Sequence, residues 1–374
     1  MAACRRAAWF TENIMVRYWW LLICLMVSLA GLAVVQAAEA QTPTPLKRIG
    51  FGSCVNQDKP QPIWETIVAA RPDLFLMCGD NVYANVTKKA DLGKFKQCYD
   101  KLAAQPGYQK LLKTCPLMAV WDDHDYGYND AGGDYVLKKE SQQIFLDFFG
   151  VPKDSPRRRQ EGVYYAQTFG PADKSVQVIM LDTRYFRSKL KPIDAMTSSK
   201  YLPDNDPKAT FLGEVQWKWF EEQLRQPARL RLVVSTIQLV AEDHPYEKWM
   251  NFPAERARFF KVLKDTKAQG VVVLSGDRHL AELSSMDAGL GYPLFDLTSS
   301  GLTEGYTKGW RKPEVNKNRV ATMTHGNNFG MVLVDWERKD PQVSLQIRDE
   351  AGDIAIQEKI SLSWLQAGGK KKGM

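Results

Sequence analysis

The chain has 374 residues, of which 44% are hydrophobic and 25% carry a charged side chain. This composition excludes an intrinsically disordered or collagen-like protein, and the length allows one large domain or two smaller ones. The formal net charge of +7 comes from 50 basic and 43 acidic residues dispersed along the chain. We see no basic stripe and no nucleic-acid reader motif, whereas a weakly positive surface is compatible with a small anionic substrate.

The beginning of the chain has the pattern of a leader that precedes the folded body. The only long apolar run covers residues 19–35, follows Arg17 and ends in small residues. This order is typical of a secretory signal peptide, here over residues 1–40, with Met1 or Met15 as the true start. The alternative is an uncleaved N-terminal membrane anchor, because an apolar run of this length approaches the span of a bilayer. Both interpretations place the body outside the cytoplasm, either secreted or in the periplasm.

The body alternates predicted strands with predicted helices. Apolar runs typical of buried strands lie at residues 46–52, 73–78, 116–121, 176–181, 231–237 and 271–275. One helix is indicated by apolar residues three and four apart, namely Leu212, Val215, Trp219, Phe220 and Leu224. A second is indicated at 253–269 by Pro253 at its start and Gly270 after its end. Residues 303–328 predict a long loop before a β-rich tail, and the alternation as a whole favours an α/β fold.

Four cysteines remain when the leader is set aside, and export would allow them to form disulfides. They are Cys54, Cys78, Cys98 and Cys115. Cys98 and Cys115 flank a short helical segment and could pair, whereas Cys78 lies in an apolar run where a buried free thiol is expected.

Polar side chains follow each predicted strand. The segments are Gly-Ser-Cys at 52–54, Gly-Asp-Asn-Val-Tyr at 79–83, Asp-Asp-His-Asp at 122–125, Asp-Thr-Arg at 182–184, Ser-Thr-Ile-Gln at 235–238 and Gly-Asp-Arg-His at 276–279. Ligand sites in open α/β sheets lie at the carboxyl ends of the strands. Because six such ends carry polar or metal-competent groups, we expect them to form one site.

Asp80, Asp123 and Asp277 would repel one another if they met at one rim of the sheet. A multivalent cation removes that conflict, so we interpret them as a metal site; the alternative is that each caps the turn or helix after it. The chain has four histidines, and two of them, His124 and His279, lie in these strand ends. Asp277 and His279 are two residues apart in an extended segment, so both can reach one centre.

Cys54 and Tyr83 add a thiol and a phenol to the expected site. A thiolate and a phenolate are strong donors to a ferric ion, and Asp80 and Tyr83 are three residues apart in a turn, so they can hold the same ion. Taken alone, Cys54 would be interpreted as half of a disulfide and Tyr83 as a packed aromatic ring. Next to Asp80 and the Gly-Asp-Arg-His segment, we interpret both as metal ligands.

Five segments in this order resemble the PhoD-like alkaline phosphatase and phosphodiesterase family, within the calcineurin-like metallophosphoesterase superfamily. They are Gly-Ser-Cys, Gly-Asp-Asn-x-Tyr, Trp-Asp-Asp-His-Asp-Tyr-Gly-x-Asn-Asp, Leu-Asp-Thr-Arg and Ser-Gly-Asp-Arg-His. The resemblance runs from Lys47 to Gly301, with a less diagnostic tail. It implies the metallophosphoesterase fold over residues 47–360, an α/β four-layer αββα sandwich of two central mixed β-sheets flanked by helices. A basic C-terminal tail at 361–374 would follow.

The resemblance also implies the cofactors, which are Fe³⁺ and one or two Ca²⁺ ions in preference to Zn²⁺ or Mn²⁺. By position, the iron ligands would be Cys54, Asp80, Tyr83 and His279, with Asp80 as the bridge. The calcium ligands would be Asp123 and Asp277, since hard oxygen donors suit Ca²⁺. Gln238 stands roughly where the superfamily has a metal-binding histidine, and its role is left open.

The implied reaction is hydrolysis of phosphate monoesters, diesters or both by attack of a metal-bridging hydroxide on phosphorus. His124 takes the place of the superfamily's catalytic histidine and would protonate the leaving alkoxide or bind the phosphate. Arg184 is expected to clamp the phosphate through its guanidinium fork, with a salt bridge to Asp182 or another acid as the alternative. Asn81 would bind the same oxygens. The mouth would be lined by Tyr126, Tyr128 and Asn129.

The leading prediction is therefore an exported phosphoric ester hydrolase that acts on small-molecule phosphate esters. We expect a monomer that contacts a membrane only if the leader is uncleaved. One alternative is a specialised phosphodiesterase for nucleotides or lipid headgroups with little monoesterase activity. Another is a catalytically silent extracytoplasmic binding module, which a missing ligand residue would favour, yet every expected ligand position is filled.

Overall fold

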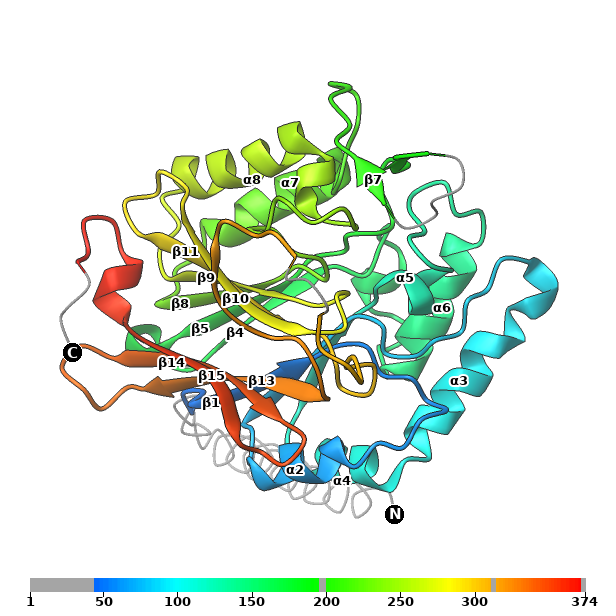
Figure 1. The fold of residues 1–374 in the computed structure, drawn as a ribbon, viewed down its shortest axis with the longest axis horizontal. Helices are drawn as coiled ribbons and strands as arrows, with labels where there is room; N and C mark the ends of the chain where they lie inside the picture. The colour runs from blue at the N-terminus through cyan, green and yellow to red at the C-terminus, as the bar shows by residue number, and fades with distance from the viewer. Residues whose placement is uncertain (1–43, 195–199, 311–313, 371–374) are drawn as a thin grey trace, which may run out of the picture. The chain divides into compact units, whose positions relative to one another are not determined.

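Two mixed β-sheets form the centre of the body in the computed structural model (Figure 1). The structure describes residues 44–194, 200–310 and 314–370. The leader predicted over residues 1–40 and the end of the tail at 371–374 lie outside the described residues. In the part of the chain that is described, no helix combines the length and the apolar character needed to cross a membrane.

The first sheet has six strands in the order β15-β14-β13-β1-β2-β3. Its strands are β1 (Arg48–Gly52), β2 (Leu74–Cys78), β3 (Leu117–Val120), β13 (Asn328–Asp335), β14 (Gln342–Asp349) and β15 (Ile354–Ser361). β1, β2 and β3 are parallel, with Phe51 opposite Leu76 and Cys78 opposite Val120. β13 pairs with β1 antiparallel and continues into an antiparallel meander. The three parallel strands therefore end at the same edge.

The second sheet has seven strands in the order β12-β10-β11-β9-β8-β5-β4. They are β4 (Tyr165–Phe169), β5 (Val176–Met180), β8 (Leu230–Val234), β9 (Val271–Ser275), β10 (Ala281–Asp287), β11 (Pro293–Ser299) and β12 (Arg319–Met323). β5, β8, β9 and β11 are parallel. β6 (Lys191–Pro192) and β7 (Tyr201–Leu202) form a separate two-stranded ribbon. The prediction of one long loop over 303–328 is wrong at β12, which pairs with β10.

Helices cover the outer faces of the two sheets. The α-helices are α2 (Ile63–Ala69), α3 (Gly93–Ala103), α4 (Pro106–Thr114), α5 (Asp123–Tyr126), α6 (Lys138–Phe148), α7 (Gly213–Leu224) and α8 (Pro253–Asp265). Short 3₁₀ turns are η1 (Lys89–Asp91), η2 (Pro156–Arg158), η3 (Ala172–Lys174), η4 (Trp249–Asn251) and η5 (Leu362–Leu365). Figure 1 shows α7 and α8 on the side of the second sheet and α2 and α4 on the side of the first. The body is thus the predicted αββα sandwich.

Residues of the central strands point alternately into two hydrophobic cores. In β9, Val272 and Leu274 belong to the core that also contains Phe51 of the first sheet. Val271 and Val273 belong to the core beneath α7 and α8. A strand that is buried on both faces is apolar at every position, which explains why the sequence shows continuous apolar runs here.

The predicted strands and helices are present, but α8 ends at Asp265 and not at residue 269, and the predicted buried face of α7 is wrong at one position. Val215 was expected on the buried face but is 60% exposed, while Trp217 is 1% exposed. Gln216 is also buried, because its side chain donates a hydrogen bond to the carbonyl oxygen of Asp182 and accepts one from the Asp182 N–H. A polar residue that links α7 to the end of β5 therefore takes a position that periodicity alone assigns to an apolar one.

The four cysteines of the described body are free thiols. Cys98 and Cys115 do not form the disulfide that their spacing allowed. Cys54 and Cys78 are fully buried, as expected for Cys78. Of these four, Cys54 alone is grouped with potential metal ligands in the residues that the structure describes.

Candidate metal centre

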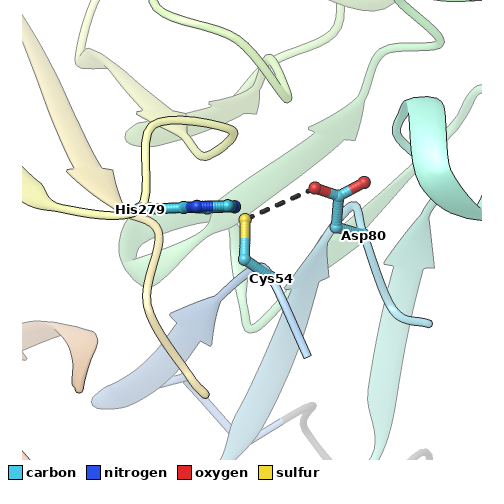
Figure 2. Close-up of side chains that lie close together, drawn as sticks. All are labelled: Cys54, Asp80 and His279. Carbon is cyan, nitrogen blue, oxygen red and sulfur yellow. Dashed lines mark hydrogen bonds between the residues drawn. The ribbon is translucent and has the colours of Figure 1, made fainter. Parts of the chain in front are cut away.

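The carboxyl ends of strands from both sheets meet and bring the predicted ligands together. Ligand atoms of Cys54, Asp80 and His279 lie within 4.8 Å of one another, and Figure 2 shows the Cys54 thiol between the other two side chains. Asp80 also belongs to a second group of this kind, with Asp123 and His124. A third group contains Asp122, Asp123 and Asp277. Because Asp80 and Asp123 are each shared by two groups, the three groups form one continuous cluster.

The backbone at this cluster adopts conformations that are rare for residues with a side chain. Cys54, Asp80, Asp277 and His279 have φ angles of 65°, 49°, 70° and 55°. Such left-handed conformations cost of the order of 1 kcal/mol or more each and persist where the surrounding structure enforces them, often at functional sites. Gly79, which precedes Asp80, has a φ of 96°, and a Cβ there would lie 2.5 Å from the Asp122 Cβ. The chain thus turns sharply after each strand end.

Tyr83 lies at the same point as the first group. Its hydroxyl is 2.9 Å from the His279 Nε2 and donates a hydrogen bond of 3.3 Å to the Asp80 Oδ2. The Cys54 Sγ lies 3.5 Å from the same carboxylate oxygen. The structure therefore brings together the sulfur, the phenol, the imidazole and the carboxylate that the sequence suggested as one set.

Burial keeps these donors uncharged in the absence of a cation. It raises the pKa of the Cys54 thiol to about 12 and raises the pKa values of Asp80 and Tyr83 well above their usual values. Burial also lowers the pKa of His279 to about 4, so its imidazole is neutral, as a metal-ligating histidine must be. A bound cation would favour the ionised thiol, phenol and carboxyl groups, because metal ions reverse the local pKa pattern.

The carboxylates on the other side of the cluster have unpartnered oxygens. The Oδ1 of Asp123 and the Oδ2 of Asp122 are buried and accept no hydrogen bond from any described residue. Burial, followed by the charges of Asp122 and Asp123, raises the pKa of Asp277 well above its usual value. Burial would also raise the pKa of Asp123, but His124 and Arg184 lower it overall. Buried carboxylate oxygens without partners are rare unless a cation or water contacts them, so this donor set fits hard cations.

His124 is held by a residue that the sequence analysis did not single out. Its Nδ1 lies 2.7 Å from the Oδ1 of Asn85, and its ring packs against Tyr83 with the centroids 4.2 Å apart and the planes tilted by 31°. Its backbone N–H donates a hydrogen bond of 3.2 Å to the Asp80 Oδ1. Since the Asn85 oxygen can only accept, it fixes a proton on Nδ1 and leaves Nε2 available. The position of Asn85 two residues after Tyr83 was the one signal for it in the sequence.

Arg184 is fully buried, and its guanidinium forms ion pairs with acidic side chains. Its Nε donates to the Asp122 Oδ1 and its Nη1 to the Glu247 Oε2, both at 2.5 Å, while its Nη2 lies 3.9 Å from the Asp277 Oδ1. These contacts correspond to the salt-bridge alternative, with Asp122 and Glu247 as the acids in place of Asp182. Asp182 instead accepts a hydrogen bond from the Arg184 backbone N–H. Glu247 lies far from the strand-end segments in the chain, so its role could not be predicted from the sequence.

The other predicted site residues lie around the cluster without joining it. The Asn81 side-chain amide is fully buried and donates to the Val120 carbonyl oxygen and to Asp125. Tyr126 is fully buried and donates to the Gly132 carbonyl oxygen, so it belongs to the core and not to an open mouth. Tyr128 is half-buried and Asn129 is exposed, as residues of a mouth would be. Gln238 is buried and donates to Glu282 and Thr298.

Comparisons with known proteins concern the family and the fold. A family model described as PhoD-like phosphatase matches residues 49–345. The fold is similar to a solved structure described as "Structure of PhoD", with a TM-score of 0.67 and 18% identity over 88% of this chain and 74% of that chain. It is also similar to GAP50, described as the anchor in the inner membrane complex of Plasmodium, with a TM-score of 0.53 and 13% identity over 85% of this chain and 89% of that chain. At these identities the likeness concerns the fold alone. Curated proteins provide no match.

Proposed function

Because the chain belongs to the PhoD-like phosphatase family, we propose that it is an exported, metal-dependent hydrolase of small-molecule phosphate monoesters and diesters. Membership of the family supports phosphoric ester hydrolysis. The observation that carries the metal dependence is the meeting of Cys54, Asp80, Tyr83 and His279 at one point beside the carboxylates of the other strand ends. Export rests on the leader pattern of residues 1–40, ahead of a phosphatase domain at 47–360.

We assign the ligands by the chemistry of their donor atoms. Cys54, Tyr83 and His279 supply sulfur, phenol oxygen and imidazole nitrogen, which suit Fe³⁺, and Asp80 reaches both sides of the cluster. The carboxylates with unpartnered oxygens suit Ca²⁺. When bound, such ions lower the pKa of a water and withdraw charge from the phosphoryl oxygens. To the carboxylate ligands Asp123 and Asp277 we add Asp122, which shares a group with both.

His124 is proposed as the proton donor to the leaving oxygen. Asn85 holds its Nδ1, so that Nε2 can carry the proton that the leaving alkoxide takes up. Its ring is also held by the packing contact with the Tyr83 ring. Arg184 is assigned to positioning, because its guanidinium holds Asp122 and Glu247. The negative charge that develops on the phosphoryl oxygens would therefore be balanced at the metal centre.

Metal analysis of the purified protein tests the ligand assignment. We expect iron together with calcium, and we expect Cys54→Ser to lose iron because it removes the only sulfur donor of the cluster. Cys78→Ser is the matched control, since Cys78 is equally buried but lies outside the ligand groups. Zinc or manganese alone in the native protein, or unchanged iron in Cys54→Ser, would contradict the assignment.

Turnover of aryl phosphate monoesters and diesters tests the activity. Asp80→Asn should lower kcat at least about a hundredfold, because it removes the carboxylate shared by two ligand groups, while the protein stays folded. A preference for diesters would favour the specialised phosphodiesterase. Native protein that holds its metals and hydrolyses neither class would support the silent binding module instead.

A further inference from the structure

A second group of basic side chains surrounds Tyr246, on the segment between β8 and α8. Lys248 Nζ donates to the Tyr246 carbonyl oxygen at 3.2 Å, the Arg278 guanidinium lies 4.4 Å from the centre of the Tyr246 ring, and the His244 and Tyr246 rings are 6.2 Å apart. Lys248, Arg278 and His244 are each 4% exposed. We call these three side chains and Tyr246 the Tyr246 cluster.

Several buried nitrogen atoms of this cluster have no hydrogen-bond partner in the described chain, which is unusual for buried polar atoms. Neither ring nitrogen of His244 has a hydrogen-bond partner among the described residues, and neither has the Nε of Arg278. Lys248 forms no ion pair with a carboxylate of the described chain within 4.0 Å. Buried donors are nearly always satisfied, because leaving them unpartnered is costly. The cluster therefore lacks an acceptor, and its charge indicates that the acceptor is an anion.

The acids near the cluster do not supply that acceptor. Glu314 pairs with Arg278 at 2.6 Å through Nη2 only. The carboxylate of Glu247 is taken by Arg184 and by Arg187. Burial, followed by the charge of Arg278, lowers the pKa of Lys248 to about 8 and lowers the pKa of His244 well below its usual value. The charges of Asp243 and Glu247 act on Lys248 in the opposite direction, although neither carboxylate forms an ion pair with its ammonium in the described chain. The His244 imidazole is neutral, with one N–H to donate and one nitrogen to accept.

The Tyr246 cluster borders the candidate metal centre. Arg278 lies between Asp277 and His279 in the chain. Tyr306 links the two places, since its N–H donates to the His279 carbonyl oxygen and its ring lies edge-on to the His279 ring at 6.0 Å. The charges of Arg278 and Glu314 both act on the Tyr306 hydroxyl. Arg278 and Tyr306 therefore connect the Tyr246 cluster to the part of the candidate metal centre that His279 forms.

We propose that the Tyr246 cluster is a second oxyanion subsite, which takes a non-scissile phosphate group of the substrate while the scissile phosphate lies at the metal centre. This proposal rests on the proposed function and narrows it to phosphate esters that carry a second phosphate group. Lys248 supplies an ammonium without a carboxylate partner, and His244 and Arg278 supply unpartnered nitrogens, which together match the several oxygens of a phosphate. The aromatic ring of Tyr246 holds the Arg278 guanidinium in place.

Calorimetric titration of the full, metal-loaded protein with inorganic phosphate tests the subsite directly. We expect two phosphates per chain in the native protein, and one in Lys248→Met. Asp80→Asn should keep the phosphate of the Tyr246 cluster while it loses turnover. The matched control is Lys138→Met, which removes a half-buried lysine that likewise donates to backbone carbonyl oxygens and should still bind two. A single phosphate in the native protein that Asp80→Asn abolishes, or an unchanged Lys248→Met, would overturn the proposal.

A kinetic ratio provides the second measurement. We expect kcat/KM for an aryl phosphate with a second phosphate group, divided by kcat/KM for the same ester without it, to fall about tenfold in Lys248→Met. Lys248→Arg should restore most of the ratio, which a purely structural role of Lys248 would not predict. A constant ratio in folded Lys248→Met would refute the subsite. If no ester is hydrolysed but Lys248→Met still loses one phosphate, the proposed function fails and the subsite stands.

Discussion

Asp277→Asn should stabilise the protein without metals and destabilise it with them. One carboxylate oxygen of Asp277 lies within 4.8 Å of oxygens of Asp122 and Asp123. At an effective dielectric constant of ~20, each ionised pair at that distance repels by about 3.5 kcal/mol. The attraction between Asp277 and Arg184, whose charged atoms are 3.9 Å apart, offsets about 4 kcal/mol of the repulsion summed over the two pairs. The net repulsion is thus about 3 kcal/mol when all three acids are ionised.

Partial protonation reduces that figure at neutral pH. Burial raises the pKa of Asp122 to about 7, although the nearby Arg184 lowers it, so Asp122 is ionised in only part of the molecules. We therefore expect Asp277→Asn to raise the free energy of unfolding of metal-free protein by about 1–3 kcal/mol. An acid whose pKa is raised by folding loses its favourable contribution as the pH rises. The metal-free native protein should accordingly lose stability from about pH 4 to beyond pH 7, and less so in Asp277→Asn.

Urea unfolding, monitored by circular dichroism with chelator and again with calcium and iron, measures both effects. With metals, Asp277→Asn should unfold at lower urea than the native protein because it has lost a ligand. Asp296→Asn is the matched control, since Asp296 is a buried acid that accepts hydrogen bonds from Leu239, Val240 and Ser275. The control should be destabilised in both conditions. If Asp277→Asn in chelator is destabilised relative to the native protein as much as it is with metals, the carboxylates do not repel one another and the reasoning is refuted.

Two further substitutions test the supporting residues. Asn85→Ala should lower kcat about ten- to a hundredfold with little change in KM, because His124 loses the acceptor that fixes its Nδ1. A shifted pH–rate profile would distinguish this effect from general damage to the fold. An unchanged kcat would exclude the role of Asn85. Arg184→Met should lower the free energy of unfolding by about 3–5 kcal/mol, because it leaves Asp122 and Glu247 buried without their cation. Equal urea midpoints for Arg184→Met and native protein would show that those ion pairs contribute little.

The predicted ligands are brought together because each is adjacent to a strand end. Cys54, Asp80 and Asp277 follow β1, β2 and β9 within two residues, so finding the strands was enough to place each of them at the carboxyl end of a strand. Buried strands are easy to find, since parallel strands covered on both faces are apolar at every position. The alternation of strands and helices therefore follows from local patterns, whereas the division of the strands between two sheets was implied by the family resemblance alone.

The supporting contacts could not be predicted, because they join segments that are far apart in the chain. Arg184 and Asp122 are 62 residues apart, and Arg184 and Glu247 are 63 apart. A buried arginine beside a site looks the same in sequence whether it binds substrate or another acid. The exposed Val215 of α7 has a similar origin, because a hydrogen bond from Gln216 to the end of β5 fixes the rotation of the helix.

The proposed ligand set is divided between the two sheets. Cys54, Asp80 and Asp123 follow strands of the first sheet, whereas Asp277 and His279 follow β9 of the second. Neither sheet alone carries all of the proposed ligands, and the first sheet itself combines β1, β2 and β3 with β13, β14 and β15 from the other end of the chain. Bound cations would consequently link the two sheets, and metal binding would require that both sheets are packed together. A split version of this chain would recover its metals only upon reassembly.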